Sequence, residues 1–316
     1  MGRFAYHGPK LVFSGRMMTE LKIIELLARW APDKAPGMVR GIGDDCAIFR
    51  PRPREDLLFT TDLLVEDVHF RRTTHTAGDC GHKTLARGLS DIAAMGGRPR
   101  FCLLSLAVGK GLDQRWVEGF YKGLLELARE TGCPLAGGDL AHADQTAADI
   151  IVCGAVPRGK ALRRDTARPG DGVFVTGALG VSALGLATGK GLPWRRHLRP
   201  EPRLAAGLAL RRLGASAAMD LSDGLSIDLH RLAKASGVAA MLNGDLPAFE
   251  GATLAQALHG GEDYELLFTL GARKKAPLAL AGLPVTRIGR IIEGPPGQVR
   301  VPGGILQPLG YDHFRK

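Results

Sequence analysis

Short buried apolar runs alternate with amphipathic helical patterns along this chain, and the alternation occurs in two blocks. Apolar runs bounded by glycine, proline and charged residues are typical of buried strands, and apolar residues three and four apart are typical of helices. The alternation therefore predicts an α/β (α+β) protein with mixed sheets and helices packed on them. A segment rich in Arg, Pro and Gly, residues 157–172, separates the blocks and predicts a domain boundary.

The length supports two domains, because 316 residues are about twice the usual size of one domain. We expect an N-terminal domain over residues 19–157 and a C-terminal α/β domain over residues 158–316. Residues 1–18 are basic and irregular, and amphipathic spacing starts only near Leu21, so we expect them to form a loose arm.

Individual elements follow from the same patterns. The first block predicts strands over residues 57–61, 101–108 and 149–156, and helices over residues 83–95 and 113–130. The second block predicts helices over residues 181–188, 201–213 and 225–235, between strands at residues 173–176, 264–270 and 285–292, near residue 238 and ending at residue 220. Asp113 is an expected N-cap and Gly132 an expected helix end. Lys83, Arg87 and Asp91 lie opposite the apolar stripe of their helix, so Asp91 projects away from that helix's own core.

Composition and charge exclude several classes of protein. The chain is 45% hydrophobic and 23% charged, which is typical of a folded globular protein and excludes a disordered or collagen-like chain despite 43 glycines. A net charge of +10 is compatible with nucleic acid, an anionic membrane surface or small polyanions such as nucleotides. The arginines are spread in ones and twos and only 6% of residues are aromatic, so we expect no nucleic-acid partner.

Cysteine usage and apolar stretches predict the compartment. The five cysteines are odd in number, widely separated and form no Cys-x-x-Cys pair, which indicates buried thiols in a reducing cytoplasm. The N-terminal segment lacks the apolar core and cleavage site of a signal peptide. Residues 172–189 are uncharged, but their five glycines favour a strand, a turn and a helix over a membrane span. We therefore expect a cytoplasmic protein without a membrane partner.

Aspartates recur beside glycines or at strand ends. They occur in GIGDD (residues 41–45), TTD (60–62), SD (90–91), GGD (137–139) and DLSDG (220–224). Glycine lets the backbone admit a bulky anion, and a carboxylate at a strand end points into the crevice where α/β proteins bind ligands. Because phosphates and carboxylates repel each other, bringing them together requires a cation, and Mg²⁺ is the usual one around nucleotide phosphates.

For any single aspartate, a helix cap or an Asx-turn is the alternative interpretation. Two places favour metal binding instead. Adjacent Asp44 and Asp45 repel each other unless a cation lies beside them. In residues 220–224, Ser222 or Asp223 can serve as the cap, which leaves Asp220 at the strand end unexplained. We expect one of this second pair of aspartates to bind a metal.

Familiar catalytic and nucleotide-binding motifs are absent from the sequence. It contains no Gly-x-x-x-x-Gly-Lys-Ser/Thr loop, no Gly-x-Gly-x-x-Gly opening a helix after a strand, and no His-Arg-Asp loop. The amides of residues 176–180 could bind phosphate at a helix start, although a glycine turn that only joins strand to helix is the favoured interpretation. The histidines lack zinc-ligand spacing and no Ser-His-Asp order is evident, so we expect no hydrolase triad.

Seven motifs, taken together, carry a resemblance to a known family. They are GIGDDCAIF, FTTDLLVEDVHF, KTLARGLSDIAAMGGRP, AGGD, MDLSDGLSIDL, GGEDYELLFT and GYDHF, spread between residues 19 and 314. In this order and spacing they resemble the thiamine-monophosphate kinases, of the superfamily that includes aminoimidazole ribonucleotide synthetase. The resemblance implies phosphorylation of thiamine monophosphate to thiamine diphosphate with ATP and several Mg²⁺ ions. It also implies a homodimer formed through the N-terminal domains, with the phosphates in a cleft between domains.

Residue roles are carried over motif by motif from this resemblance. The implied metal shell is Asp45, Thr60, Thr61, Asp62, Asp91, Asp139, Asp220 and Asp223, with Asp44 as a neighbour. The implied ATP contacts are Gly138, Arg164, Ser222 and Tyr121, and the implied thiamine contacts are His69, Glu262 and Tyr311. The alternatives are a packed loop histidine for His69 and a core tyrosine for Tyr311.

The implied chemistry fits the residues present. The nucleophile would be a phosphate monoester, which is largely ionised at neutral pH because its second pKa is near 6. No general base is then required, so we assign no proton-transfer residue and expect direct in-line transfer without a phospho-enzyme. The chain departs from the family at Gly88, where asparagine is usual, and at Leu140 and Ala141, where threonines are usual.

Two other functions remain open at this point. One is another ATP-using enzyme of the same superfamily with a different phosphorylated or amide substrate, against which GGEDYE and GYDHF favour the thiamine branch. The other is a non-catalytic protein that binds nucleotide or nucleic acid. The presence of Asp62, Asp91 and Asp220 argues against lost catalysis.

Overall fold

The computed structural model describes residues 12–13, 16–17, 24, 27–30, 36–42, 46–243 and 245–311. The expected arm over residues 1–18 is described only at strands β1 (Val12–Phe13) and β2 (Arg16–Met17), which pair antiparallel. Asp44, Asp45 and the last residues of the GYDHF motif lie outside the described residues.

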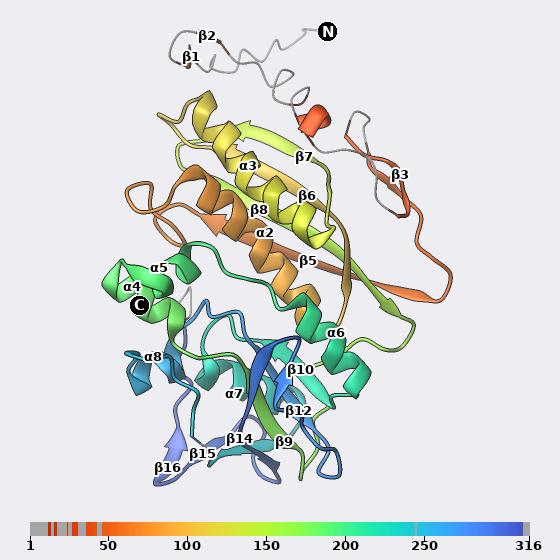
Figure 1. The fold of residues 1–316 in the computed structure, drawn as a ribbon, viewed down its shortest axis with the longest axis vertical. Helices are drawn as coiled ribbons and strands as arrows, with labels where there is room; N and C mark the ends of the chain where they lie inside the picture. Colours follow the sequence, from red (N-terminus) through yellow and green to blue (C-terminus); the bar gives the residue numbers. More distant parts are fainter. Residues whose placement is uncertain are drawn as a thin grey trace, which may run out of the picture.

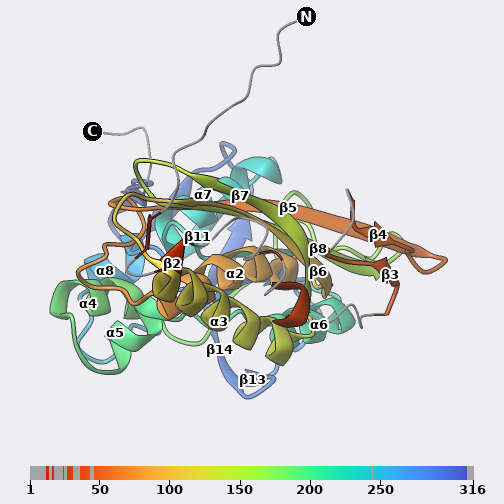
Figure 2. The same ribbon diagram turned by 90° about the horizontal axis from the view of Figure 1, so that it is seen from above.

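The first half of the chain forms a four-stranded sheet covered on one face by two helices. The strands are β5 (Glu55–Val65), β6 (Arg98–Val108), β7 (Leu135–His142) and β8 (Ala147–Pro157), in the order β5-β8-β6-β7. Only the β6–β7 pair is parallel. Helices α2 (Ala77–Ala94) and α3 (Gln114–Thr131) lie side by side on one face of this sheet (Figures 1 and 2).

The described residues cover the opposite face of this sheet only in part. Strands β3 (Met38–Arg40) and β4 (Ile48–Phe49) pair with each other and pack against it. The rings of Phe49 and Phe101 lie 5.1 Å apart between their centroids. Farther along the same face, Phe59 and Leu63 of β5 are exposed. This uncovered part of the sheet is called the outer face below.

The second half of the chain forms an eight-stranded sheet within the described residues. Its strands are β9 (Gly172–Thr176), β10 (Ala217–Asp220), β11 (Ala239–Leu242), β12 (Leu266–Leu270), β13 (Ala279–Leu280), β14 (Leu283–Ile292), β15 (Val299–Val301) and β16 (Gly304–Leu306). The order is β10-β12-β9-β14-β11-β15-β16, and β13 pairs with β14. Its helices are α4 (Val181–Thr188), α5 (Gly191–Leu198), α6 (Leu204–Leu213), α7 (Leu225–Ala235) and α8 (Leu254–His259).

At strands β9, β10 and β12, both faces of this second sheet are buried. Val173 and Val175 of β9 pack in one apolar cluster with α7, whereas Phe174 packs with α6 in another. Successive residues of a strand point to opposite faces, so a continuous apolar run is required here.

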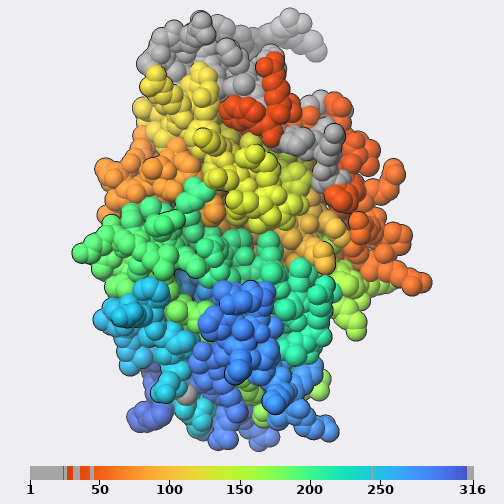
Figure 3. All heavy atoms as spheres, in the orientation of Figure 1, coloured from red at the N-terminus to blue at the C-terminus, as the bar shows by residue number. Residues whose placement is uncertain are grey.

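Helix α2 joins the two halves. Its last turn, at Ala93 and Ala94, packs in the same cluster as Phe174 and Phe268 of the second sheet. Helix α6 approaches so closely that a Cβ atom on Gly207 would lie 2.0 Å from the carbonyl oxygen of Ala93. In the sphere view, the segment that contains α4, α5 and α6, coloured green, forms a band between the upper and lower halves (Figure 3). One side of α2 therefore faces the second half of the chain.

The expected fold class, mixed sheets with helices packed on them, is confirmed. Asp113 caps α3 by accepting a hydrogen bond from the Trp116 amide at 3.0 Å, and Gly132 ends the helix in the left-handed conformation. Helices α4 and α7 occupy residues 181–188 and 225–235, as expected.

The structure differs from the sequence-based expectations at several places. The Gly-Gly-Asp motif at residues 137–139 lies inside a strand, because β7 pairs with β6 as far as His142. Helix α5 was not expected, and α6 begins at Leu204 rather than residue 201, after Pro200 and Pro202. Cys46 is exposed, while the other four cysteines are buried as expected. None of the described helices is long and apolar enough to cross a membrane.

Candidate active site

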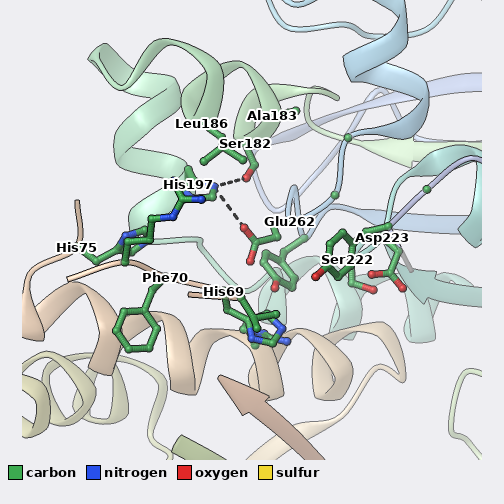
Figure 4. A pocket seen from close by; sticks show the side chains of 18 of the residues that line it. His69, Phe70, His75, Ser182, Ala183, Leu186, His197, Ser222, Asp223 and Glu262 are labelled. Atoms are coloured by element: carbon green, nitrogen blue, oxygen red, sulfur yellow. Dashed lines mark hydrogen bonds and ion pairs between the residues drawn. The ribbon is translucent and has the colours of Figure 1, made fainter. Parts of the chain in front are cut away.

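A cavity of about 1390 Å³ lies between the two halves of the chain. Its walls come from β5, the loop after β5 and α2 on one side, and from α4, α5 and the segments after β10 and α8 on the other. The residues expected from the sequence that line it are Asp62, Asp91, Asp220, Asp223, Ser222, His69, Glu262 and Tyr311. Figure 4 shows Ser222 and Asp223 on one side of Glu262, and Phe70 and His75 on the other. The cavity therefore has an acidic end and an aromatic end.

The acidic end is built where α2 meets the ends of β5 and β10. Asp91 accepts a hydrogen bond from the Thr60 hydroxyl, and Asp220 accepts one from the Ser90 hydroxyl at 2.7 Å. Asp62 pairs with Arg87, whose Nη2 lies 2.6 Å from Asp62 Oδ1. Consecutive residues of α2 thus bond to β5 in one half and to β10 in the other.

These carboxyl groups are costly to ionise where they lie. Burial raises the pKa of Asp62 to about 6, and the charges of Asp91 and Glu262 act in the same direction. Burial, followed by the charge of Asp91, raises the pKa of Asp220 to about 8. Burial also raises the pKa of Asp91. Since buried carboxylates that repel one another favour a bound cation, the acidic end is suited to positive charge.

Strand alternation divides the expected metal residues between two faces. Thr60 and Asp62 point toward α2, whereas Thr61 lies on the outer face and donates to Asp149 Oδ1 at 2.5 Å. Asp139 pairs across the sheet with Ser105, which pairs with Asp149, and directly paired residues share a face. Asp139 is therefore on the outer face as well. The structure does not bring Thr61 and Asp139 to the cavity.

The expected ATP contacts are also divided. Ser222 lines the cavity. Arg164 is exposed and is not among the lining residues, but its positive charge lowers the pKa of both Asp91 and Asp220, against the effect of burial. Gly138 lies on β7, and Tyr121 is only 2% exposed in the core of the first half. Neither Gly138 nor Tyr121 is brought to the cavity.

The residues that could hold a metal have oxygen donors, as Mg²⁺ prefers. Among the described residues, no three His, Cys, Asp or Glu side chains converge closely enough to hold one ion together. Mg²⁺ at nucleotide sites is commonly bound by one or two carboxylates, with water and phosphate oxygens completing the shell. Asp62, Asp91, Asp220 and Asp223 fit this arrangement, in which the substrate supplies the remaining ligands.

The DLSDG segment is capped differently from our expectation. The N-cap of α7 is Gly224, and no side chain caps it from outside the helix. Instead Asp228, inside the helix, accepts hydrogen bonds from the amides of Asp223 and Gly224, each at 3.1 Å. Neither Ser222 nor Asp223 serves as the cap, and both residues line the cavity. The Asp223 carboxylate also accepts a hydrogen bond from Arg231 of α7 at 2.5 Å.

The turn before α4 does not offer its amides to a ligand. The carboxylate of Asp263 accepts from Gly180 N at 2.6 Å and from Ser182 N at 2.9 Å. Because one carboxylate already satisfies these amides, the favoured interpretation of residues 176–180, a turn joining strand to helix, agrees with the structure.

The aromatic end contains residues that sequence reasoning missed. Trp194 and His197 of α5 are stacked with their centroids 5.1 Å apart, and His75 meets the Trp194 ring edge-on at 5.7 Å. Burial lowers the pKa of His75 and of His197 to about 4, so both rings are neutral at pH 7. Helix α5 is only eight residues long and has Gly191 and Pro193 at its start, so the sequence gave too short a signal to find these residues.

Glu262 lies between the two ends of the cavity. Figure 4 shows His197 joined by dashed lines to both Ser182 and Glu262, and its Nδ1 lies 2.9 Å from Ser182 Oγ and 3.3 Å from Glu262 Oε2. The Lys83 ammonium lies 2.9 Å from the same carboxylate oxygen. Lys83 and Arg87 share one face of α2 with Asp91, and this shared face is the sequence signal for their part in the site.

The expected thiamine contacts have distinct environments. His69 is partly buried and its Nδ1 accepts a hydrogen bond from the Val65 amide at 3.0 Å, which leaves the proton of the neutral ring on Nε2. Tyr311 is 47% exposed at the rim of the cavity, so the alternative of a core tyrosine is wrong. His69 lines the cavity as well as packing in its loop.

Comparison with known proteins identifies the class first. The N-terminal domain of AIR synthase related proteins matches residues 43–157, and the C-terminal domain of the same proteins matches residues 168–302. These matches, on the two sheets described above, define a two-domain AIR synthase related protein.

The curated and solved relatives narrow this class. Thiamine-monophosphate kinase of Salmonella typhimurium is 39% identical over 301 residues, which cover 87% of this chain and 91% of the relative. The crystal structure of thiamine-monophosphate kinase from Stenotrophomonas maltophilia superimposes with a TM-score of 0.79 at 37% identity, over 91% of this chain and 96% of the other. A structure of AaThiL complexed with AMPPCP and TMP gives a TM-score of 0.76 at 32% identity, over 93% and 97%. The chain belongs to the thiamine-monophosphate kinase family, and the resemblance stated from its motifs is confirmed.

Proposed function

We propose that this protein phosphorylates thiamine monophosphate to thiamine diphosphate, with ATP as the phosphoryl donor, in the cavity between its two halves. The observation that carries the proposal is the meeting of Asp62 and Asp91 from one half with Asp220 from the other in a single cavity. The likeness to a relative whose structure holds AMPPCP and TMP supports both substrates.

The acidic end is the proposed place for the phosphates. Two polyanionic substrates have to be aligned there against their mutual repulsion. Bound Mg²⁺ would neutralise charge on the transferred phosphoryl group. We propose Thr60, Asp62, Asp91, Asp220 and Asp223 as the residues around the metal, together with Asp45. Thr61 and Asp139 lie on the outer face, so they would bind a metal only at that face and not in the cavity.

The part of the cavity from Glu262 toward the aromatic end is the proposed place for the thiamine rings. The thiazolium ring is cationic, and Glu262 offers a carboxylate there beside His69 and Tyr311. Ser222 and Arg164 are proposed ATP contacts. Gly138 lies on β7 away from the cavity, so it would contact ATP only if the nucleotide reached the outer face. We leave Tyr121 out, because its buried ring has no surface for a ligand.

The proposed reaction is a direct in-line transfer between two phosphates. The acceptor oxygen of a phosphate monoester is already ionised at neutral pH, so none of the cavity's histidines has to remove a proton. Burial keeps His75 and His197 neutral, with pKa values of about 4, which suits packing rather than proton transfer. Labelled phosphate trapped on the protein after incubation with ATP alone would contradict this mechanism.

A product assay tests the proposal. Purified protein is incubated with ATP and Mg²⁺ and with either thiamine or thiamine monophosphate, and the products are separated by chromatography. Thiamine diphosphate formed only from the monophosphate is the expected result. ATP consumption without thiamine diphosphate would favour another substrate of the superfamily.

We also propose that the protein is a cytoplasmic homodimer whose N-terminal halves, up to about residue 157, meet through the outer face. Phe59 is 65% exposed and Leu63 is 49% exposed on that face, and apolar side chains grouped on an open sheet favour a partner surface. In such a dimer Thr61 and Asp139 would lie at the interface.

Phe59→Glu is expected to convert the dimer to monomers, because it places a charge in the middle of the proposed apolar interface. Light scattering after size-exclusion chromatography measures the mass. Leu278→Glu is the matched control, since Leu278 is 91% exposed in the other half of the chain and should leave the dimer intact. A monomeric wild-type protein, or a Phe59→Glu variant that stays dimeric, would contradict this assignment.

A further inference from the structure

Lys83 of α2 is a fully buried lysine that bonds across the cavity wall to the other half of the chain. Its side chain is 0% exposed, and its ammonium lies 2.9 Å from Glu262 Oε2. Lysine is almost never fully buried unless it is paired, because removing an ammonium from water is costly. Lys83 is not among the residues that line the cavity, so it faces the back of Glu262 rather than the ligand space.

The Lys83 ammonium also reaches the main chain of His69. Nζ lies 3.4 Å from the His69 carbonyl oxygen, at the limit of a hydrogen bond. His69 and Glu262 come from opposite halves of the chain, and both line the cavity. One buried cation thus contacts both residues from behind.

Glu262 needs support to hold its place. Its backbone has a φ of 64°, in the left-handed region that side-chain-bearing residues rarely adopt. The Glu262 amide donates to the Ser222 carbonyl oxygen at 2.7 Å, which ties the backbone to the acidic end. Strained backbone of this kind persists only where the surroundings determine it, and it is frequent at ligand sites.

The charges that face Glu262 come from several elements. Burial is the largest single influence on the pKa of Glu262 and acts to raise it, but the Lys83 charge, the His197 charge, the Lys83 hydrogen bond and the Arg87 charge together outweigh burial, so the net shift is downward. Arg87 is engaged with Asp62. His197 is neutral at pH 7, since burial lowers its pKa to about 4. Lys83 is therefore the full positive charge in direct contact with Glu262 among the described side chains.

We propose that Lys83 is a positioning residue, which holds the ionised Glu262 carboxylate and the His69 loop in place to receive the cationic ring of the acceptor substrate. The inference rests on the proposed function, because the acceptor is taken to be thiamine monophosphate. Glu262 keeps 24% of its side chain exposed, so the carboxylate can contact a ligand while Oε2 is held by Lys83. The phosphate donor binds at the other end, and its binding does not depend on this pair.

Lys83→Met tests the proposal, because methionine keeps most of the volume and removes the charge. The KM for thiamine monophosphate is expected to rise at least about ten-fold, as for loss of one partner of a buried charge pair. The KM for ATP is expected to stay within about two-fold of the wild-type value. Calorimetric titration with thiamine monophosphate, without ATP, should show the same loss of affinity.

His82→Gln is the matched control. His82 precedes Lys83 on α2, is 7% exposed, and also bonds across to the other half, with Nε2 2.9 Å from the Pro200 carbonyl oxygen. It lies outside the cavity lining. If His82→Gln raised the KM for thiamine monophosphate as much as Lys83→Met did, a general loosening between the halves would explain both, and the proposal would be wrong.

A double-mutant cycle with Glu262→Gln separates positioning from direct contact. If Lys83 acts through Glu262, adding Lys83→Met to Glu262→Gln should change the KM for thiamine monophosphate by less than about two-fold. This double variant leaves no unpaired buried charge, so the comparison remains available if Lys83→Met alone does not fold. A further ten-fold rise in the double variant, or an unchanged KM in Lys83→Met, overturns the proposal.

The wild-type assay distinguishes failure of this inference from failure of the proposed function. If the wild-type protein does not form thiamine diphosphate from thiamine monophosphate, the proposed function is wrong and the inference falls with it. If the wild-type protein forms the product and Lys83→Met has an unchanged KM, only the inference is wrong.

Discussion

The Asp91→Asn enzyme is expected to lose at least about 10³-fold in kcat while remaining folded, because a ligand or counter-charge of the metal–phosphate centre is worth several kcal/mol in the transition state. Asp91 has the central place in the acidic end. It accepts the Thr60 hydrogen bond from β5, and its charge raises the pKa of both Asp62 and Asp220. Asparagine removes the charge at nearly constant shape.

The fold should tolerate this change. The charge of Asp91 repels its neighbours in the protein without bound metal, so its removal relieves repulsion, and the melting temperature of the metal-free protein should not fall. Asp144→Asn is the control, because it makes the same chemical change at a different place. The Asp144 side chain is 86% exposed, pairs with Lys110 and lies outside the cavity. Steady-state kinetics with thiamine monophosphate and a thermal melt are the measurements. Asp91→Asn enzyme with more than about a tenth of the wild-type kcat would contradict the proposed role.

Gly81→Ala is expected to destabilise the protein by more than about 2 kcal/mol, because the two helices of the first half touch at this glycine. A Cβ atom on Gly81 of α2 would lie 1.9 Å from the Phe120 carbonyl oxygen of α3. The contact is reciprocal one turn away, where a Cβ on Gly123 of α3 would lie 2.0 Å from the Gly78 carbonyl oxygen. Backbone cannot move aside as a side chain can, so the helices would have to separate.

Helix propensity alone predicts the opposite change in stability for Gly81→Ala. In a helix interior, alanine is favoured over glycine by about 1 kcal/mol, so propensity alone predicts a gain in stability from Gly81→Ala. Gly78→Ala in the same helix is the matched control, since its Cβ would meet nothing nearer than 3.6 Å and should not destabilise the protein. Urea unfolding followed by circular dichroism compares the three proteins. An unfolding midpoint for Gly81→Ala at or above that of the wild type would show that α2 and α3 are not packed as described.

Elements with strong local signals could be predicted at close to their true positions. Helix α3 has an aspartate that accepts from the Trp116 amide at its start and a left-handed glycine at its end, and both were readable as caps. Helix α7 has apolar residues at helical spacing. In contrast, α5 is only eight residues long, has Gly191 and Pro193 at its start and packs against α4, so its local sequence gives a weak prediction of a helix.

The candidate site could be predicted only in part for a related reason. Motifs indicated which carboxylates carry chemistry, but a motif does not say which face of a strand a residue occupies. Thr60, Thr61 and Asp62 are consecutive, and the two-residue period of β5 sends Thr61 to the outer face and its neighbours toward α2. Asp139 has an intact Gly-Gly-Asp motif, yet the pairing of β7 with β6 puts it on the same outer face.

By itself, the amino-acid sequence determined the fold class, the family and the residue types of the site, because periodicity, caps and short motifs are local properties of the chain. Tertiary structure alone decided which of these residues meet. Ser90 bonds to Asp220 and Lys83 to Glu262 across separations of 130 and 179 residues, and α2 brings both pairs together because it packs on the first sheet while its other side faces the second half. No local pattern encodes such a meeting, since it depends on how two sheets and their helices pack around one shared element.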